Sequence, residues 1–121
     1  FNVRIFRSRE WIGNIYMLDF TRPLGVLLVD RIQIARKRKA DYVHFFEDLA
    51  EVLAELFAEV EYRELLAPIA ISNHAMVQQK FNDYKEKLPK RKIMFHPSSH
   101  RHFESVRRRS FYVLHRKGGG E

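Results

Sequence analysis

The first twenty residues carry two short runs that are rich in strand-forming side chains. Residues 2–7 and 12–20 contain most of their Val, Ile, Tyr and Phe at positions that suit a pleated strand. The charged residues 8–10 between them can form a turn, and Pro23 interrupts the chain after the second run. We therefore expect an N-terminal β-hairpin.

A third apolar run follows Gly25. Residues 26–29 are all apolar, and Ile32 and Ile34 can continue the run by alternation. This pattern favours a third strand. The same stretch can instead begin a helix with Asp30 as its N-cap, so the helix stays open as the alternative.

Residues 41–64 have the clearest helical pattern of the chain. Apolar residues recur at alternating steps of four and three, which places them on one stripe of a helix. The stripe consists of Tyr42, Phe46, Leu49, Leu53, Leu56 and Val60. Asp41 is the expected N-cap. The simplest interpretation is a helix packed on the core of this chain, although a stripe of this spacing can also pair with another chain.

Acidic residues recur every four positions on another face of this helix. They are Glu47, Glu51, Glu55 and Glu59. Like charges at this spacing oppose the helix by about 0.2–0.5 kcal/mol per pair. Basic groups alongside would remove that cost, and they can come from the Arg and Lys residues of this chain or from a basic partner protein. A solvated surface is the simpler interpretation of this face.

A short apolar segment and a second helix follow. Residues 65–71 are interrupted by Pro68 and are expected to form a turn. Ser72 can cap a helix over residues 72–88, and Pro89 ends it. The apolar stripe of this helix consists of Val77, Phe81, Tyr84 and Leu88.

Two more β-like runs lie near the C-terminus, at residues 93–95 and 111–114, with a basic polar stretch between them. Residues 118–121 (Gly-Gly-Gly-Glu) are expected to be a flexible tail.

The expected fold is a single α+β domain over residues 1–117. It has N-terminal antiparallel strands, two main helices at about 41–64 and 72–88, and a C-terminal β pair. The order helix, turn, helix, strand, basic loop, strand is also that of a winged helix, in which residues 69–77 would form the turn and the start of a recognition helix. An unrelated α+β packing is the alternative.

The charge of the chain is uneven. It has 22 Lys and Arg against 15 Asp and Glu, for a net charge of +7. Residues 1–41 carry nine basic and four acidic side chains, residues 42–65 carry one and seven, and residues 66–121 carry twelve and four. An acidic segment between two basic ones points to a polyanionic partner.

Several classes of protein are excluded or disfavoured by composition. The chain has no cysteine, which removes disulfide scaffolds, thiol nucleophiles and cysteine-ligated zinc and suits an intracellular, reducing compartment. No apolar run is long enough to cross a membrane. Glycine-rich phosphate loops and other catalytic signatures are absent from the sequence, so we expect neither an enzyme nor a bound cofactor.

The start of the second helix carries short polar groups that can reach base edges. These are Asn73, His74, Gln78 and Gln79, and Lys80 can hold a phosphate. Asn and Gln pair with adenine in the major groove.

Basic clusters supply the expected phosphate contacts. They consist of Arg36, Lys37, Arg38, Lys39, Lys90, Arg91, Lys92, Arg101, Arg107, Arg108 and Arg109. Contacts of this kind are independent of base sequence and weaken steeply with salt. Phe95, Phe111 and Tyr112 are interleaved with the later clusters and can stack on bases if they are not core residues.

Three histidines lie close together, at His96, His100 and His102. A zinc site is conceivable at these spacings. Arg101 and Pro97 argue against it, and a basic loop that contacts phosphate is the simpler interpretation.

The preferred function is therefore non-enzymatic binding of DNA or RNA. One alternative is a subunit of a larger ribonucleoprotein, viral or effector assembly, or a homodimer, in which the acidic helix is the protein interface. The other is a metal-dependent nuclease built on the three histidines.

Overall fold

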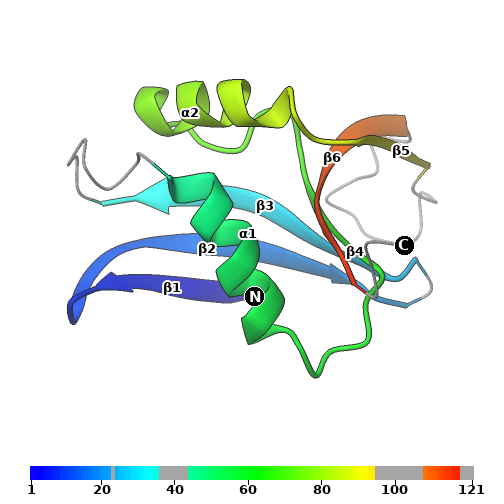
Figure 1. The fold of residues 1–121 in the computed structure, drawn as a ribbon, viewed down its shortest axis with the longest axis horizontal. Coiled ribbons are helices and arrows are strands. Elements are labelled where there is room, and N and C mark those ends of the chain that lie inside the picture. The colour runs from blue at the N-terminus through cyan, green and yellow to red at the C-terminus, as the bar shows by residue number, and fades with distance from the viewer. Residues whose placement is uncertain (23, 36–43, 95–107, 118–121) are drawn as a thin grey trace.

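The computed structural model describes residues 1–22, 24–35, 44–94 and 108–117 (Figure 1). Six strands form one sheet in the order β1-β2-β3-β4-β6-β5. The strands are β1 Asn2–Arg7, β2 Glu10–Phe20, β3 Val26–Ile34, β4 Glu64–Ala67, β5 Lys90–Met94 and β6 Arg108–Arg116, and the helices are α1 Phe45–Leu56 and α2 Ala75–Lys85. The expected α+β class, the antiparallel N-terminal strands and the C-terminal β pair are confirmed.

The N-terminal strands form an antiparallel meander. β1 and β2 are joined by a two-residue turn in which Ser8 (φ 48°) and Arg9 (φ 69°) both have left-handed backbones. Turns of this kind match the right-handed twist of the strands that they connect. β3 then runs the length of β2, which confirms a strand rather than a helix at Val26–Ile34.

The segment expected to be a turn after the first helix contains a central strand. β4 pairs in parallel with β3 on one side and antiparallel with β6 on the other. Parallel neighbours need a crossover, and α1 supplies it. The helix–turn–helix interpretation is wrong for this part of the chain, because β4 separates the two helices.

Both helices are shorter than their patterns predict. α1 ends at Leu56, and the chain then turns so that Phe57 and Tyr62 can enter the core, whereas Leu56 is exposed. Its N-cap is His44, and the expected cap Asp41 lies outside the described residues. α2 begins after His74, and the Ser72 hydroxyl accepts the His74 backbone N–H at 3.1 Å in the turn before it.

The sheet separates two apolar clusters. On one face, side chains of the strands such as Leu65 pack with Leu53 of α1 and Phe81 of α2. On the opposite face, Leu66 and Phe111 belong to a second cluster built from residues of the strands and of the turn between β2 and β3. Leu65 and Leu66 are neighbours in β4 and point to opposite faces, and both faces are buried. This explains why apolar and polar residues do not alternate in this strand.

One side chain anchors the loop that leads into α2. The Gln78 amide oxygen accepts the backbone N–H groups of Ile71 and Ser72, at 2.8 and 3.1 Å. Its amide nitrogen donates to the Ile69 carbonyl at 3.0 Å. The Ile71 carbonyl in turn accepts the Ile32 N–H at 2.8 Å, so this loop extends the pairing of β3.

A buried carboxylate connects the central strand to the C-terminal hairpin. Glu64 is 7% exposed and lies 3.2 Å from both the Arg91 and the Arg116 guanidinium groups. These pairs join β4 to β5 and β6. Neither of the described helices is long and apolar enough to span a membrane.

We predict that Glu64→Gln lowers the free energy of unfolding by about 1–2 kcal/mol. The two guanidinium groups would lose a charged acceptor, but both are half exposed and can turn toward water, which limits the cost. Urea unfolding measures this change. Glu59→Gln, at an exposed position, is the control and should change stability by less than about 0.5 kcal/mol. Equal stability of the two variants would show that the Glu64 pairs contribute nothing.

We also predict that Gln78→Ala destabilises the protein by about 1–3 kcal/mol, because two backbone N–H groups would lose their acceptor. The neighbouring Gln79 donates only to Asp83, at 3.3 Å on the surface, so Gln79→Ala should be nearly neutral. Thermal unfolding of the two variants makes the comparison, and a stable Gln78→Ala protein would contradict the anchoring role.

Candidate nucleic-acid interface

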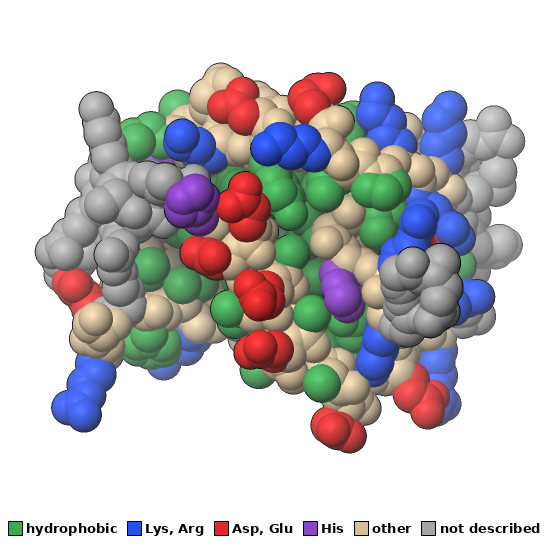
Figure 2. Space-filling view, viewed as in Figure 1, with side chains coloured by type: hydrophobic (Ala, Val, Ile, Leu, Met, Phe, Trp, Pro, Cys, Tyr) green, Lys and Arg blue, Asp and Glu red, His purple; other side chains and the backbone are tan. Residues whose placement is uncertain are grey.

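On the helix-bearing side of the sheet, acidic and basic side chains of the described residues lie on different elements. Residues 44–61 carry six acidic side chains and no Lys or Arg, whereas residues 80–92 carry six basic and two acidic side chains. Figure 2 shows the acidic side chains in a column over α1 and the basic ones gathered over the end of α2 and the β5–β6 hairpin. A polyanion would therefore be attracted to the β5 end of this side and repelled from α1.

The expected basic cluster at residues 90–92 divides between the two faces of the sheet. Lys90 and Lys92 alternate with Arg91, and Lys90 lies opposite Tyr112, which belongs to the helix-side cluster. Lys90 and Lys92 therefore lie on the same side as α2, whereas Arg91 lies on the opposite face and pairs with Glu64. Because side chains alternate along a strand, Arg91 does not share a surface with Lys90 and Lys92.

We use the name basic edge for the lysines that α2, the turn after it and β5 bring together. It consists of Lys80, Lys85, Lys87, Lys90 and Lys92. The Lys85 ammonium lies 5.5 Å from the centre of the Tyr112 ring and 5.9 Å from that of Phe81, so it packs on the aromatic rings beneath it. Among the described residues, none of these five lysines forms an ion pair with a carboxylate.

The expected base-reading residues of the second helix do not share one surface. Asn73 and His74 line a groove of about 260 Å³ at the start of α2. Gln78 points into the loop that it anchors, and Gln79 pairs with Asp83. The groove also contains Arg31 and Gln33 from β3, which the sequence analysis did not single out.

Six of the expected basic residues and the three expected histidines lie outside the described residues. They are Arg36, Lys37, Arg38, Lys39, Arg101, Arg107, His96, His100 and His102. Arg108 and Arg109 are the first residues of β6, opposite Met94 and Ile93. Within the described part of the chain, no group of three potential metal ligands occurs.

Phe111 and Tyr112 are core residues, so the stacking role that required them to be outside the core does not apply. Phe111 is 1% exposed and Tyr112 is 7% exposed, and they belong to the clusters on opposite faces of the sheet. Neither ring can receive a base without opening the core. Phe95 lies outside the described residues.

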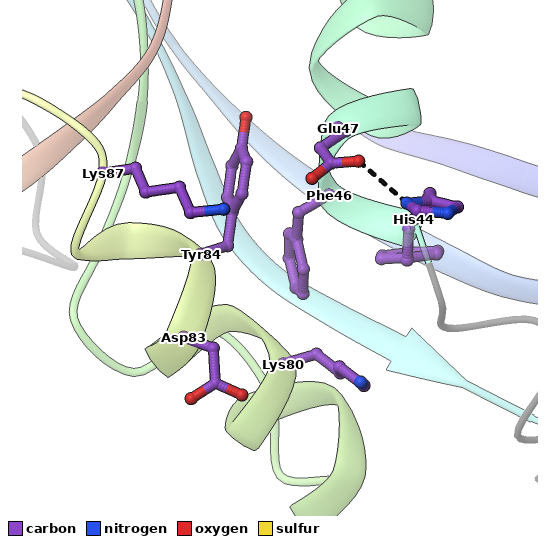
Figure 3. Close-up of a pocket in the computed structure, with 8 residues that line it drawn as sticks. His44, Phe46, Glu47, Lys80, Asp83, Tyr84 and Lys87 are labelled. Atoms are coloured by element: carbon purple, nitrogen blue, oxygen red, sulfur yellow. Dashed lines mark hydrogen bonds and ion pairs between the residues drawn. The ribbon is translucent and has the colours of Figure 1, made fainter.

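A pocket of about 230 Å³ lies between the start of α1 and α2 (Figure 3). His44 and Glu47 form its α1 side, with the His44 Nδ1 3.0 Å from a Glu47 carboxylate oxygen. Lys80, Asp83, Tyr84 and Lys87 line the other side. Burial, and then the Glu47 charge, raise the pKa of the Tyr84 hydroxyl, so it stays protonated near neutral pH.

The lining of this pocket has no hydroxyl or thiol nucleophile other than the Tyr84 hydroxyl. The His44–Glu47 pair is solvent-exposed, and no serine, threonine or cysteine lines the pocket to act as a nucleophile. Lys80 and Lys87 line this pocket together with Glu47 of α1, so the pocket lies where the two charged surfaces meet.

The acidic face of α1 is exposed, as its spacing predicts. Glu47, Glu51 and Glu55 lie on the outer side of the helix, and Glu59 follows in the turn after it. Two apolar side chains accompany them, Val52 at 57% exposure and Leu56 at 55%.

Comparison of the chain with models of protein families, with curated proteins and with solved structures gives no match.

Proposed function

We propose that this protein binds nucleic acid without catalysing a reaction on it, and that the basic edge supplies contacts to the phosphate backbone. The observation that carries the proposal is the sorting of charge on the helix-bearing side. Five lysines lie along the chain from the middle of α2, through the turn after it, to β5, while the neighbouring helix carries the acidic residues.

The basic edge consists of lysines, and this composition suits contact with the phosphates of a polymer. Binding of a carboxylate in one fixed geometry would favour arginine instead. Lysines are flexible point charges that contact phosphates without regard to base sequence. β5 is the edge strand of the sheet in the described part of the chain, and Lys90 and Lys92 are exposed there, where a long polymer can contact them. The acidic face of α1 limits the orientations in which a polyanion can bind.

Asn73, Arg31 and Gln33 add groups that can contact bases or sugars. They line the groove at the start of α2. The eleven residues of α2 separate this groove from Lys85, at the end of the helix, by about 16 Å. A bound strand that follows α2 can therefore reach both.

A second candidate function has an observation of its own. The exposed Val52 and Leu56 lie among the carboxylates of α1, a combination that suits a partner protein with a basic and partly apolar surface. In that case the protein would be one subunit of a larger assembly. Light scattering distinguishes the two, because a monomer that binds nucleic acid by itself needs no second subunit.

We predict that Lys90→Gln/Lys92→Gln weakens nucleic-acid binding and lowers the slope of log K against log salt by about 1.5. Each lost phosphate contact removes about 0.7–0.9 from the slope. Fluorescence anisotropy with labelled DNA and RNA, titrated between about 50 and 200 mM salt, gives both quantities.

The matched control for this variant is Arg22→Glu, which lowers the net charge by the same two units at an exposed position in the turn after β2. It should keep the wild-type slope. If both variants lose the same affinity, net charge rather than the basic edge governs binding. No binding of any nucleic acid by the wild-type protein at 50 mM salt would refute the proposed function.

A further inference from the structure

The face of β1, β2 and β3 that points away from the helices carries exposed aromatic rings. Val3 and Ile5 of β1, and Ile15 and Met17 of β2, pack on the helix-side cluster. The residues that alternate with them therefore point to the opposite face. These residues include Arg4, Phe6, Asn14 and Tyr16.

Two β-bulges bring further residues to this face. At the first, the register of β1 and β2 shifts between Ile5 and Phe6. Phe6 then pairs with Trp11, which places the two rings opposite each other. The other lies between Tyr16 and Met17, and beside it Tyr16 pairs with Arg31. We call this surface the aromatic face; it consists of Arg4, Phe6, Trp11, Asn14, Tyr16, Arg31 and Gln33.

Phe6 and Trp11 are exposed although they are among the largest apolar side chains of the protein. Phe6 is 54% exposed and Trp11 is 36% exposed. Exposed rings on adjacent strands of a sheet cost hydrophobic free energy and commonly mark a binding surface.

Polar contacts hold the rings of Tyr16 and Trp11 in place. The Tyr16 hydroxyl donates to the Gln33 amide oxygen at 2.8 Å, and the Trp11 indole N–H donates to the Asn14 amide oxygen at 3.3 Å. Since both amides use their oxygen in this way, their NH2 groups can donate to a base edge. Rings fixed before binding lose less conformational entropy when a ligand stacks on them.

Two guanidinium groups lie over the rings. The Arg31 guanidinium carbon is 4.7 Å from the centre of the Tyr16 ring, and that of Arg4 is 5.6 Å from the centre of the Phe6 ring. Arginine can stack on a base and can also pair with a phosphate. The acidic residues Glu10 and Asp30 on these strands each have an interaction partner within the protein.

We propose that the aromatic face binds unpaired nucleotides, with bases stacked on Phe6, Trp11 and Tyr16 and phosphates paired with Arg4 and Arg31. This inference rests on the proposed function and assigns it a preference for single strands. Aromatic side chains and arginines on a sheet are the means by which proteins hold splayed bases. A duplex, whose bases are already stacked and paired, offers no base plane to these rings.

The aromatic face is continuous with the groove at the start of α2. Arg31 and Gln33 belong to both, since they line the groove together with Asn73 and His74. A single strand that leaves the aromatic face can therefore pass through this groove.

The single tryptophan of the chain provides the test, because Trp11 belongs to the aromatic face. We would titrate the protein with a twenty-nucleotide oligothymidylate and with a duplex of the same length at 50 mM salt. Tryptophan emission reports stacking, and anisotropy of a dye on the oligonucleotide reports binding. The single strand should quench Trp11 emission, and the duplex should leave it nearly unchanged.

Phe6→Ala and Tyr16→Ala should each weaken single-strand binding by about 5- to 150-fold, the loss measured for a stacked base, and leave duplex binding and the salt slope unchanged. Tyr16→Phe keeps the ring and should bind nearly as the wild-type protein does. Leu56→Ala, at an exposed apolar residue on α1, is the matched control and should have no effect.

The outcomes separate this inference from the proposed function. Binding with no change in Trp11 emission, and with Phe6→Ala and Tyr16→Ala equal to wild type, would overturn the aromatic face while the basic edge stands. Absence of binding by anisotropy would overturn both. The emission of the wild-type protein decides the matter even if a variant fails to fold.

Discussion

The parallel pairing of β4 with β3 is the interaction on which the rest of the structure depends. β4 has only four residues, yet Leu65, Leu66 and Ala67 are fully buried, and the strand joins the N-terminal meander to the C-terminal hairpin. A parallel pair requires a crossover, which places α1 on one face of the sheet and turns its acidic side outward. α2 follows β4 on the same face, and its end delivers the chain to β5.

The charged surfaces follow from this arrangement. Glu64, at the start of β4, lies on the face away from the helices and holds Arg91 and Arg116 there. Lys90 and Lys92 remain on the helix-bearing face beside the lysines of α2. A strand that contacts both proposed surfaces would cross the aromatic face, enter the groove at the start of α2 and follow the basic edge from Lys80 on α2 to Lys92 on β5.

The sequence predicts the locally encoded parts of this fold. The hairpin, β3 and both helices depend on short-range patterns, and the core positions Phe46, Leu49 and Leu53 lie where the helical spacing places them. β4 could not be recognised, because a strand buried on both faces has no alternation and Pro68 after it suggests a turn. The end of α1 was also missed, since the spacing of apolar residues continues to Val60 although the chain has left the helix.

The candidate surfaces were harder to predict than the fold. The separation of Arg91 from Lys90 and Lys92 depends on which way β5 pairs, and the sequence does not specify that. The aromatic residues Phe111 and Tyr112 beside the basic clusters are in the core, whereas Phe6 and Trp11 of the N-terminal strands are exposed. Two bulges in the meander shift the register of these strands, so alternation counted along the whole of β2 or β3 misplaces Trp11 and Arg31.

The most direct test of the two proposed surfaces is to map a bound single strand on the isotope-labelled protein by NMR chemical-shift changes. We expect that addition of oligothymidylate shifts resonances of the aromatic face, of Asn73 and His74, and of the basic edge, and leaves the exposed residues of α1 unchanged. Shifts confined to α1, or no specific shifts at low salt, would contradict this expectation.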